Sequence, residues 1–228
     1  MFLVGLTGGI ATGKSLVSEF LRAEGVVVLD ADEASRHVSK RGGAVFDAIV
    51  AQFGADSVDE RSGELDRERL GQLVFADVAA RRRLNAITHP AIRRRLARLV
   101  LRHLIIGEQF VVLDLPLMYE TGTYRVVQKS VVVTCKAETQ LERLMSRNGY
   151  GEPEALRRIG AQLALDEKAA RADVVIDNEG SREETKRQVQ RLVRQLKASY
   201  LHWVVRLAIL GALSALVAIG AFIVALFW

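Results

Sequence analysis

The chain has 228 residues, half of them apolar and 6% aromatic, which is enough for one ordinary domain with a sizeable core plus an appendage. Seven basic and two acidic residues lie in 181–228, so this segment carries the whole excess charge of +5. The other 180 residues have a net charge of zero, which argues against a nucleic-acid partner. The basic C-terminal segment favours an anionic membrane surface instead. The single cysteine, Cys135, excludes an intrachain disulfide and fits a reducing compartment.

The first predicted element is a short buried strand over residues 2–6, followed by a glycine-rich loop. The stretch "GGIATGKS" matches G-x-x-x-x-G-K-[ST] and leads into a helix predicted over 14–24. Glycines let backbone N–H groups surround phosphates, and the helix start adds its positive dipole end. Lys14 is expected to reach the β- and γ-phosphates, and the Ser15 hydroxyl to bind Mg²⁺. The residues predicted to bind ATP here are Gly8, Gly9, Ile10, Ala11, Thr12, Gly13, Lys14 and Ser15.

A second strand is predicted over 26–29, and two carboxylates follow it, Asp30 and Asp32. The carboxyl ends of strands in an open α/β sheet face the ligand crevice, so a kinase could use one of them to accept the proton of an acceptor hydroxyl. Asp also commonly caps the start of a helix. One of the two is therefore expected to be a cap and the other functional.

Helical patterns come next, over residues 44–53, between Arg67 and Ile87, and from Pro90 to about Ile106. Two apolar runs, 110–115 and 131–135, predict further strands. Asp114 follows four apolar residues, a pattern typical of a strand whose carboxylate holds Mg²⁺, although a strand-end Asp in a turn fits it as well.

Helices are predicted over 139–147, 152–163 and 166–171, with a last strand over 173–177. Arg143 and Arg147 are four residues apart and so share one helix face. Such arginines could neutralise a transferring phosphoryl group beneath a helical lid, or they could form a solvated basic face. Apolar runs alternating with helices predict an α/β fold with a parallel sheet covered on both faces.

The C-terminal part divides into a basic amphipathic helix pattern over 181–206 and an uncharged run over 207–228. A helix needs about 20 apolar residues to cross the hydrocarbon core of a bilayer. Tyr200, Trp203 and Trp228 flank the run as interfacial aromatics do. The sequence therefore predicts a domain over 1–180, a basic juxtamembrane helix and a C-terminal transmembrane helix.

Taken together and in order, seven stretches of residues 2–180 resemble the dephospho-CoA kinase family, and the expected anchor makes the chain similar to its eukaryotic domain-containing members. The stretches are "LTGGIATGKS", "VLDADEASRHV", "LNAITHP", "LDLPLMYE", "QLERLMSRN", "RRIGAQ" and "ADVVIDNEG". The resemblance implies a P-loop kinase fold with a five-stranded parallel sheet, a helical lid and a helical CoA-binding region. It also implies transfer of the γ-phosphoryl group of ATP, with Mg²⁺, to the ribose 3′-hydroxyl of dephospho-CoA.

By the same resemblance, site residues carry over one by one. Asp32 is the implied base, while Asp30 helps to hold the acceptor or the metal shell. Arg143 and Arg147 contact phosphates, with Lys14 as the third cationic group. Asp177 and Asn178 lie where the family contacts adenine. His89 lies on the acceptor side, although a capping or core position before Pro90 fits it as well.

Other functions are weighed beside this one. A nucleoside or sugar kinase shares the loop, and a catalytically weak nucleotide-binding membrane protein could keep the fold; a GTPase is disfavoured because no "NKxD"-like stretch is present. A C-terminal anchor would leave the kinase domain facing the cytosol, on a mitochondrial or endoplasmic reticulum membrane.

Overall fold

The computed structural model describes residues 1–208, 210–211 and 214, and the chain divides into two compact units. The first comprises residues 1–28 and the chain from 104 onward, and the second comprises 29–103. The elements are β1 (Phe2–Gly8), α1 (Lys14–Ala23), β2 (Val28–Asp30), α2 (Ala31–Val38), α3 (Ala44–Phe53), η1 (Ala55–Ser57), α4 (Arg67–Ala76), α5 (Val78–Ile106), β3 (Phe110–Asp114), η2 (Thr123–Val126), β4 (Lys129–Thr134), α6 (Ala137–Asn148), α7 (Glu152–Gly160), α8 (Leu165–Ala170), β5 (Val174–Asp177) and α9 (Arg182–Lys197).

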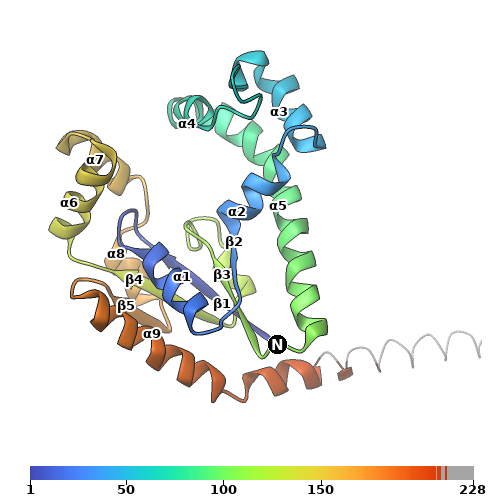
Figure 1. The fold of residues 1–228 in the computed structure, drawn as a ribbon, viewed down its shortest axis with the longest axis vertical. Coiled ribbons are helices and arrows are strands. Elements are labelled where there is room, and N and C mark those ends of the chain that lie inside the picture. Colours follow the sequence, from blue (N-terminus) through green and yellow to red (C-terminus); the bar gives the residue numbers. More distant parts are fainter. Residues whose placement is uncertain (209, 212–213, 215–228) are drawn as a thin grey trace, which may run out of the picture. The chain divides into compact units, whose positions relative to one another are not determined.

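The sheet has five strands in the order β2-β3-β1-β4-β5, as Figure 1 shows, and β1, β3, β4 and β5 belong wholly to the first unit. β1 pairs in parallel with β3 and β4, and β4 pairs in parallel with β5. The register places Leu6 beside Asp114, so the carboxyl ends of β1 and β3 meet at one edge. The predicted α/β fold with a five-stranded parallel sheet is confirmed.

The main core of this unit lies between the sheet and two helices, α1 and α9, which run side by side in Figure 1. The strands contribute alternating side chains such as Phe2, Val4 and Leu6, as expected for one face of a pleated strand. The contributing residues of α9 follow helical spacing: Val189, Leu192, Val193 and Leu196. A capping box starts α9, because the Ser181 and Glu184 side chains each bond the backbone of the other residue.

The prediction of a C-terminal transmembrane helix, and with it a membrane location, is corrected by the structure. No helix formed by residues 1–208, 210–211 and 214 combines the length and apolar character needed to cross a bilayer. The amphipathic pattern expected beside a membrane belongs to α9, and its apolar side is buried in the protein core. Of the predicted span 207–228, positions 209, 212–213 and 215–228 lie outside the described residues.

The second unit holds α2, α3, α4 and most of α5 around a small core of its own. Ile49, Leu65 and Leu70 are buried there, and Leu84 and Ile87 of α5 pack against them. The predicted helix start at Pro90 is wrong, because α5 runs unbroken through it. The break falls at Asp77 instead, whose carboxylate accepts the N–H of Ala79 at 2.7 Å and so caps α5.

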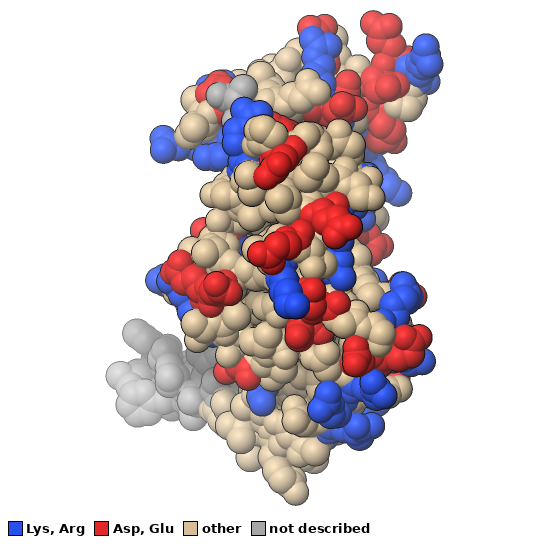
Figure 2. Space-filling model, turned by 90° about the vertical axis from the view of Figure 1, so that its left-hand side faces the viewer, with Lys and Arg blue, Asp and Glu red and all other residues tan. Residues whose placement is uncertain are grey.

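Acidic and basic side chains are interspersed over the face that Figure 2 shows. This mixture agrees with the balanced charge of the chain outside 181–228. Three ion pairs among the described residues join side chains three or four positions apart, such as the exposed pair of Arg171 with Glu167. Exposed pairs of this kind contribute little to stability.

Candidate active site

The prediction of a phosphate-binding loop over Gly8 to Ser15 is confirmed. The segment lies between strand β1 and helix α1, which is the context that such a loop requires. Gly13 has a φ of +88°, which is strained for any residue with a side chain. A Cβ atom at Gly13 would lie 2.0 Å from Nδ2 of Asn178. The loop and the residue after β5 are therefore packed too closely for anything but glycine.

Lys14, the first residue of α1, forms an ion pair with Asp114 at the end of β3. Asp114 is 3% exposed, and its second oxygen accepts a 2.6 Å hydrogen bond from the Ser18 hydroxyl. A buried carboxylate needs such partners, since burial without them is costly. The sequence predicted Lys14 and Asp114 but missed Ser18, although its place one turn after Lys14 puts it on the same helix face.

Ser15, the predicted metal ligand, is exposed in the first turn of α1. No side chain caps the start of this helix, and its first turn contains no acidic residue. The amide N–H groups and the positive end of the helix dipole are therefore available to an anion. No group of three or more potential metal ligands occurs among the side chains that the structure describes.

Four side chains from outside the loop bond its backbone. Gln162 accepts the N–H of Ile10 at 2.9 Å, and Gln140 donates to the Ile10 carbonyl at 2.8 Å. Asn178 donates to the Thr12 carbonyl at 2.8 Å, and Lys168 donates to the Gly8 carbonyl at 3.3 Å. Of these, the sequence predicted only Asn178, since the other three carry no local pattern that points to the loop.

Asn178 is the predicted adenine-site residue that the structure brings to the loop. It is 5% exposed, and the Thr185 hydroxyl donates to its side-chain oxygen at 2.9 Å. Asp177, at the end of β5, is exposed, and its carboxylate accepts the N–H of Glu179 at 2.9 Å. Asn178 thus supports the loop, while Asp177 shapes the turn that follows β5.

The two predicted lid arginines of α6 have different surroundings. Arg143 is half-buried and donates to the Asn178 carbonyl at 3.0 Å. Arg147 is exposed near the end of α6 and bonds the neighbouring Asn148 side chain at 2.8 Å. Arg143 therefore helps to hold Asn178, which bonds the loop, whereas Arg147 remains accessible to a ligand.

Asp30, Asp32 and His89 belong to the second unit and are described within it. Asp30 caps α2, because its carboxylate accepts the N–H groups of Asp32 at 2.7 Å and Glu33 at 3.2 Å. Asp32 is exposed in the first turn of α2. Partial burial, with the nearby Arg93, lowers the pKa of His89 in the middle of α5. The cap is thus Asp30, which leaves Asp32 as the functional candidate of the two.

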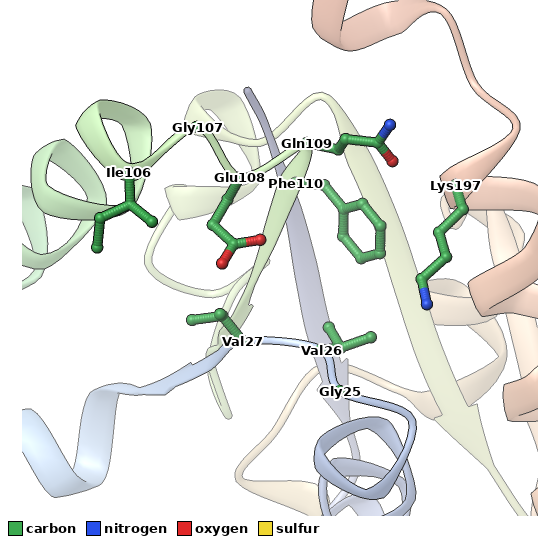
Figure 3. Close-up of a pocket in the computed structure, with 9 residues that line it drawn as sticks. All are labelled: Gly25, Val26, Val27, Ile106, Gly107, Glu108, Gln109, Phe110 and Lys197. Atoms are coloured by element: carbon green, nitrogen blue, oxygen red, sulfur yellow. The ribbon is translucent and has the colours of Figure 1, made fainter.

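The first unit also has a cavity of about 360 Å³, which Figure 3 shows. It is lined by Gly25, Val26, Val27, Ile106, Gly107, Glu108, Gln109, Phe110 and Lys197. Phe110 begins β3 and Val27 immediately precedes β2, so this cavity lies at the amino ends of these strands. None of the predicted site residues lines it.

Comparison with known proteins shows which family this chain is similar to. The family model for dephospho-CoA kinase matches residues 2–184. A dephospho-CoA kinase domain-containing protein of Danio rerio is 44% identical over 217 residues, which cover 95% of this chain and 94% of the relative. A dephospho-CoA kinase of Symbiobacterium thermophilum is 49% identical over 190 residues, 83% of this chain and 79% of the relative.

Solved structures show the same likeness in three dimensions. TT1252 from Thermus thermophilus superposes with a TM-score of 0.73 at 32% identity, covering 86% of this chain and 97% of that protein. A dephospho-CoA kinase from Campylobacter jejuni superposes with a TM-score of 0.64 at 25% identity, covering 85% of this chain and 96% of that protein.

Proposed function

Because the chain belongs to the dephospho-CoA kinase family, we propose that it transfers the γ-phosphoryl group of ATP to the ribose 3′-hydroxyl of dephospho-CoA. The observation that carries the proposal is the loop from Gly8 to Ser15 with Lys14 paired to the buried Asp114. A weak nucleotide-binding protein is less well supported, since Lys14, Asp32 and Asp114 are all present.

The proposed donor site uses the loop amides and Lys14 to hold the triphosphate of ATP. Lys14 is the first residue of α1, and its ammonium pairs with Asp114 at the end of β3, so its side chain lies at the loop where the phosphates are proposed to bind. Asn178 and Asp177 are proposed on the adenine side, and Arg143 orients Asn178 through its carbonyl. Arg147, being exposed, is proposed to contact the phosphates directly.

We propose that the exposed Ser15 hydroxyl holds a magnesium ion directly, because Mg²⁺ typically takes one or two protein ligands and completes its shell with substrate phosphates and water. Lys14 and Ser18 occupy the two oxygens of Asp114, so this carboxylate would act on the ion through a water. Both residues come from elements that end or begin at the edge of the sheet beside the loop. When bound, the ion would neutralise charge on the phosphates. The chain's own part is to present one hydroxyl and one carboxylate to it.

On the acceptor side, Asp32 is proposed to accept the proton of the 3′-hydroxyl. The hydroxyl oxygen then bonds the γ-phosphorus, and the bond from that phosphorus to the β–γ bridging oxygen breaks, releasing ADP. Asp30 holds the first turn of α2 through two backbone bonds and so orients Asp32. His89 is proposed to line the acceptor region in its neutral form, since its pKa is lowered.

The test is formation of CoA by the full chain from Mg-ATP and dephospho-CoA. We expect Asp32→Asn to lower turnover by about 10²-fold or more, the usual contribution of a positioned base, and to leave ATP affinity nearly unchanged. Glu33→Gln is the matched control, because Glu33 is exposed in the same turn of α2. A chain that binds ATP but forms no CoA with a panel of acceptors would overturn the proposal.

A further inference from the structure

A fully buried lysine lies against the nucleotide-binding loop. The Lys168 side chain, from α8, has no exposed surface. Its ammonium is 2.7 Å from Oε1 of Glu120 and 3.3 Å from the carbonyl oxygen of Gly8, the first residue of the loop. Lysine is among the residues least often buried, and a buried charge requires such partners to be tolerated.

Glu120 connects this lysine to the segment between α7 and α8. Its Oε1 also accepts the N–H of Leu163 at 3.1 Å. Burial alone would raise the pKa of Glu120, but hydrogen bonds from Lys168 and from the Leu163 amide lower it below its ordinary value. The neighbouring Gln162 accepts the N–H of Ile10. Residues 162–163 are therefore connected to the loop in two ways. Gln162 bonds Ile10 directly, and Leu163 is linked to Gly8 through Glu120 and Lys168.

The bond to Gly8 has a specific geometric effect. In a trans peptide the C=O and the following N–H point in opposite directions within one plane. Because Lys168 holds the Gly8 carbonyl on its own side, the N–H of Gly9 is directed to the other side. The lysine therefore fixes the orientation of a loop amide that it does not touch.

Packing alone does not require a charge at this position. Of this pair, Lys168 is fully buried, whereas the Glu120 side chain is 21% exposed. A buried charge can often be replaced together with its partner by apolar side chains of similar volume without loss of stability, whereas removing the partner alone leaves the buried charge uncompensated. A charged pair at this position is thus of use mainly to the group it orients, which here is the Gly8–Gly9 peptide.

We propose that Lys168, held by Glu120, is a positioning residue for phosphoryl transfer, which fixes the first peptide of the loop for the phosphates of ATP. The inference rests on the proposed function and deepens its donor site. Lys168 does not itself contact ATP. Its role is to orient the loop amides and to connect the loop with the segment between α7 and α8.

The experiment compares the full-length unmodified chain with Lys168→Met and with the double variant Lys168→Met/Glu120→Met. Three quantities are measured: the thermal midpoint of unfolding, the Kd for Mg-ATP by calorimetry, and the KM for dephospho-CoA. Affinities are measured at a temperature where each chain is folded by circular dichroism. Arg171→Met is the matched control, because Arg171 directly follows α8, is exposed and pairs with the exposed Glu167 of that helix.

We expect Lys168→Met to weaken ATP binding at least about tenfold, as for loss of a hydrogen bond from a charged group, with the KM for dephospho-CoA unchanged. The double variant should regain thermal stability, because neither charge is left unpaired, while ATP affinity stays low. Arg171→Met should behave as the unmodified chain.

The proposal is overturned if the double variant regains ATP affinity together with stability, since the pair would then act only on the fold. It is also overturned if Lys168→Met does not fold at any temperature, because the ammonium would then be required for the fold itself. These outcomes are independent of the proposed reaction. If the unmodified chain binds ATP but forms no CoA, the reaction is refuted while calorimetry still tests Lys168.

Discussion

At the scale of single residues, the loop is fitted to its surroundings atom by atom. Gly13 has a positive φ, and an added Cβ would overlap Asn178. Asn178 in turn bonds the Thr12 carbonyl and the Thr185 hydroxyl. A change at Gly13 therefore disturbs both the loop and the side chain that supports it.

We expect Gly13→Ala to lower the free energy of unfolding by about 1–3 kcal/mol, through backbone strain and displacement of Asn178. ATP binding should weaken at least tenfold, roughly one lost loop hydrogen bond. Gly71→Ala is the control: an added Cβ there meets nothing within 4 Å, and in α4 it should stabilise by about 0.5–1 kcal/mol. Thermal unfolding and ATP calorimetry measure both. Unchanged ATP affinity in Gly13→Ala would contradict the close fit.

Cys135 offers a second prediction at this scale, since it is the chain's only cysteine. Burial raises the pKa of its thiol, and Asp177 and Glu179 act in the same direction, opposed by Arg143. A neutral buried thiol reacts slowly. We expect no reaction with a chromogenic disulfide reagent at pH 7 until urea unfolds the protein, when one thiol per chain reacts. If the folded protein instead reacted rapidly with one equivalent of the reagent, the thiolate would be accessible and the prediction would be wrong.

The residues around the loop also show how far a sequence can predict a site. The phosphate-binding loop was predictable because its residues are contiguous and their chemistry is local. Lys168 was not predictable, because the carbonyl it bonds lies 160 positions away. Which of Asp30 and Asp32 caps α2 could be decided only from the backbone of that helix. There the N–H groups of Asp32 and Glu33 both donate to the Asp30 carboxylate.

At the scale of elements, amphipathic spacing alone did not tell α9 from a helix lying on a membrane. Both have apolar residues on one side and basic residues on the other. In the structure the apolar side meets α1 and the sheet, and the basic residues face outward. The break between α4 and α5 was likewise misplaced, since Asp77 caps the helix and Pro90 is accommodated inside it.

The role of α9 in the core predicts a large effect of Leu192→Ala. Leu192 is 3% exposed within the core cluster, so truncation should lower the free energy of unfolding by about 2–5 kcal/mol. Gln195→Ala, on the exposed side of the same helix, should change it by less than about 0.5 kcal/mol. Urea titration of both variants measures the difference. If both variants changed the free energy of unfolding by the same small amount, the packing of α9 in the core would be contradicted.

At the scale of the whole molecule, several titratable groups respond to acid in the same direction. The pKa of His89 is lowered, chiefly by burial, and that of Glu120 is lowered in spite of burial by its hydrogen bonds. In each case the unfolded chain binds the proton at a higher pH than the folded chain. Stability contributed by such groups is present above the unfolded pKa and is lost as the pH falls through the folded one.

We therefore expect the thermal midpoint to be steady at neutral pH and to fall in two steps on acidification. The first begins below about pH 6.5, where unfolded His89 protonates, and the second below about pH 4.5, where unfolded Glu120 does. His89→Gln should remove much of the upper step and leave the lower one. Glu120→Gln should lower the midpoint at neutral pH, because Lys168 loses its partner, and should reduce the lower step, to which Glu179 and Glu184 also contribute because their pKa values are lowered too. A midpoint that rises between pH 7 and 5 would contradict the sign of both shifts, since the folded protein would then bind protons more readily than the unfolded chain.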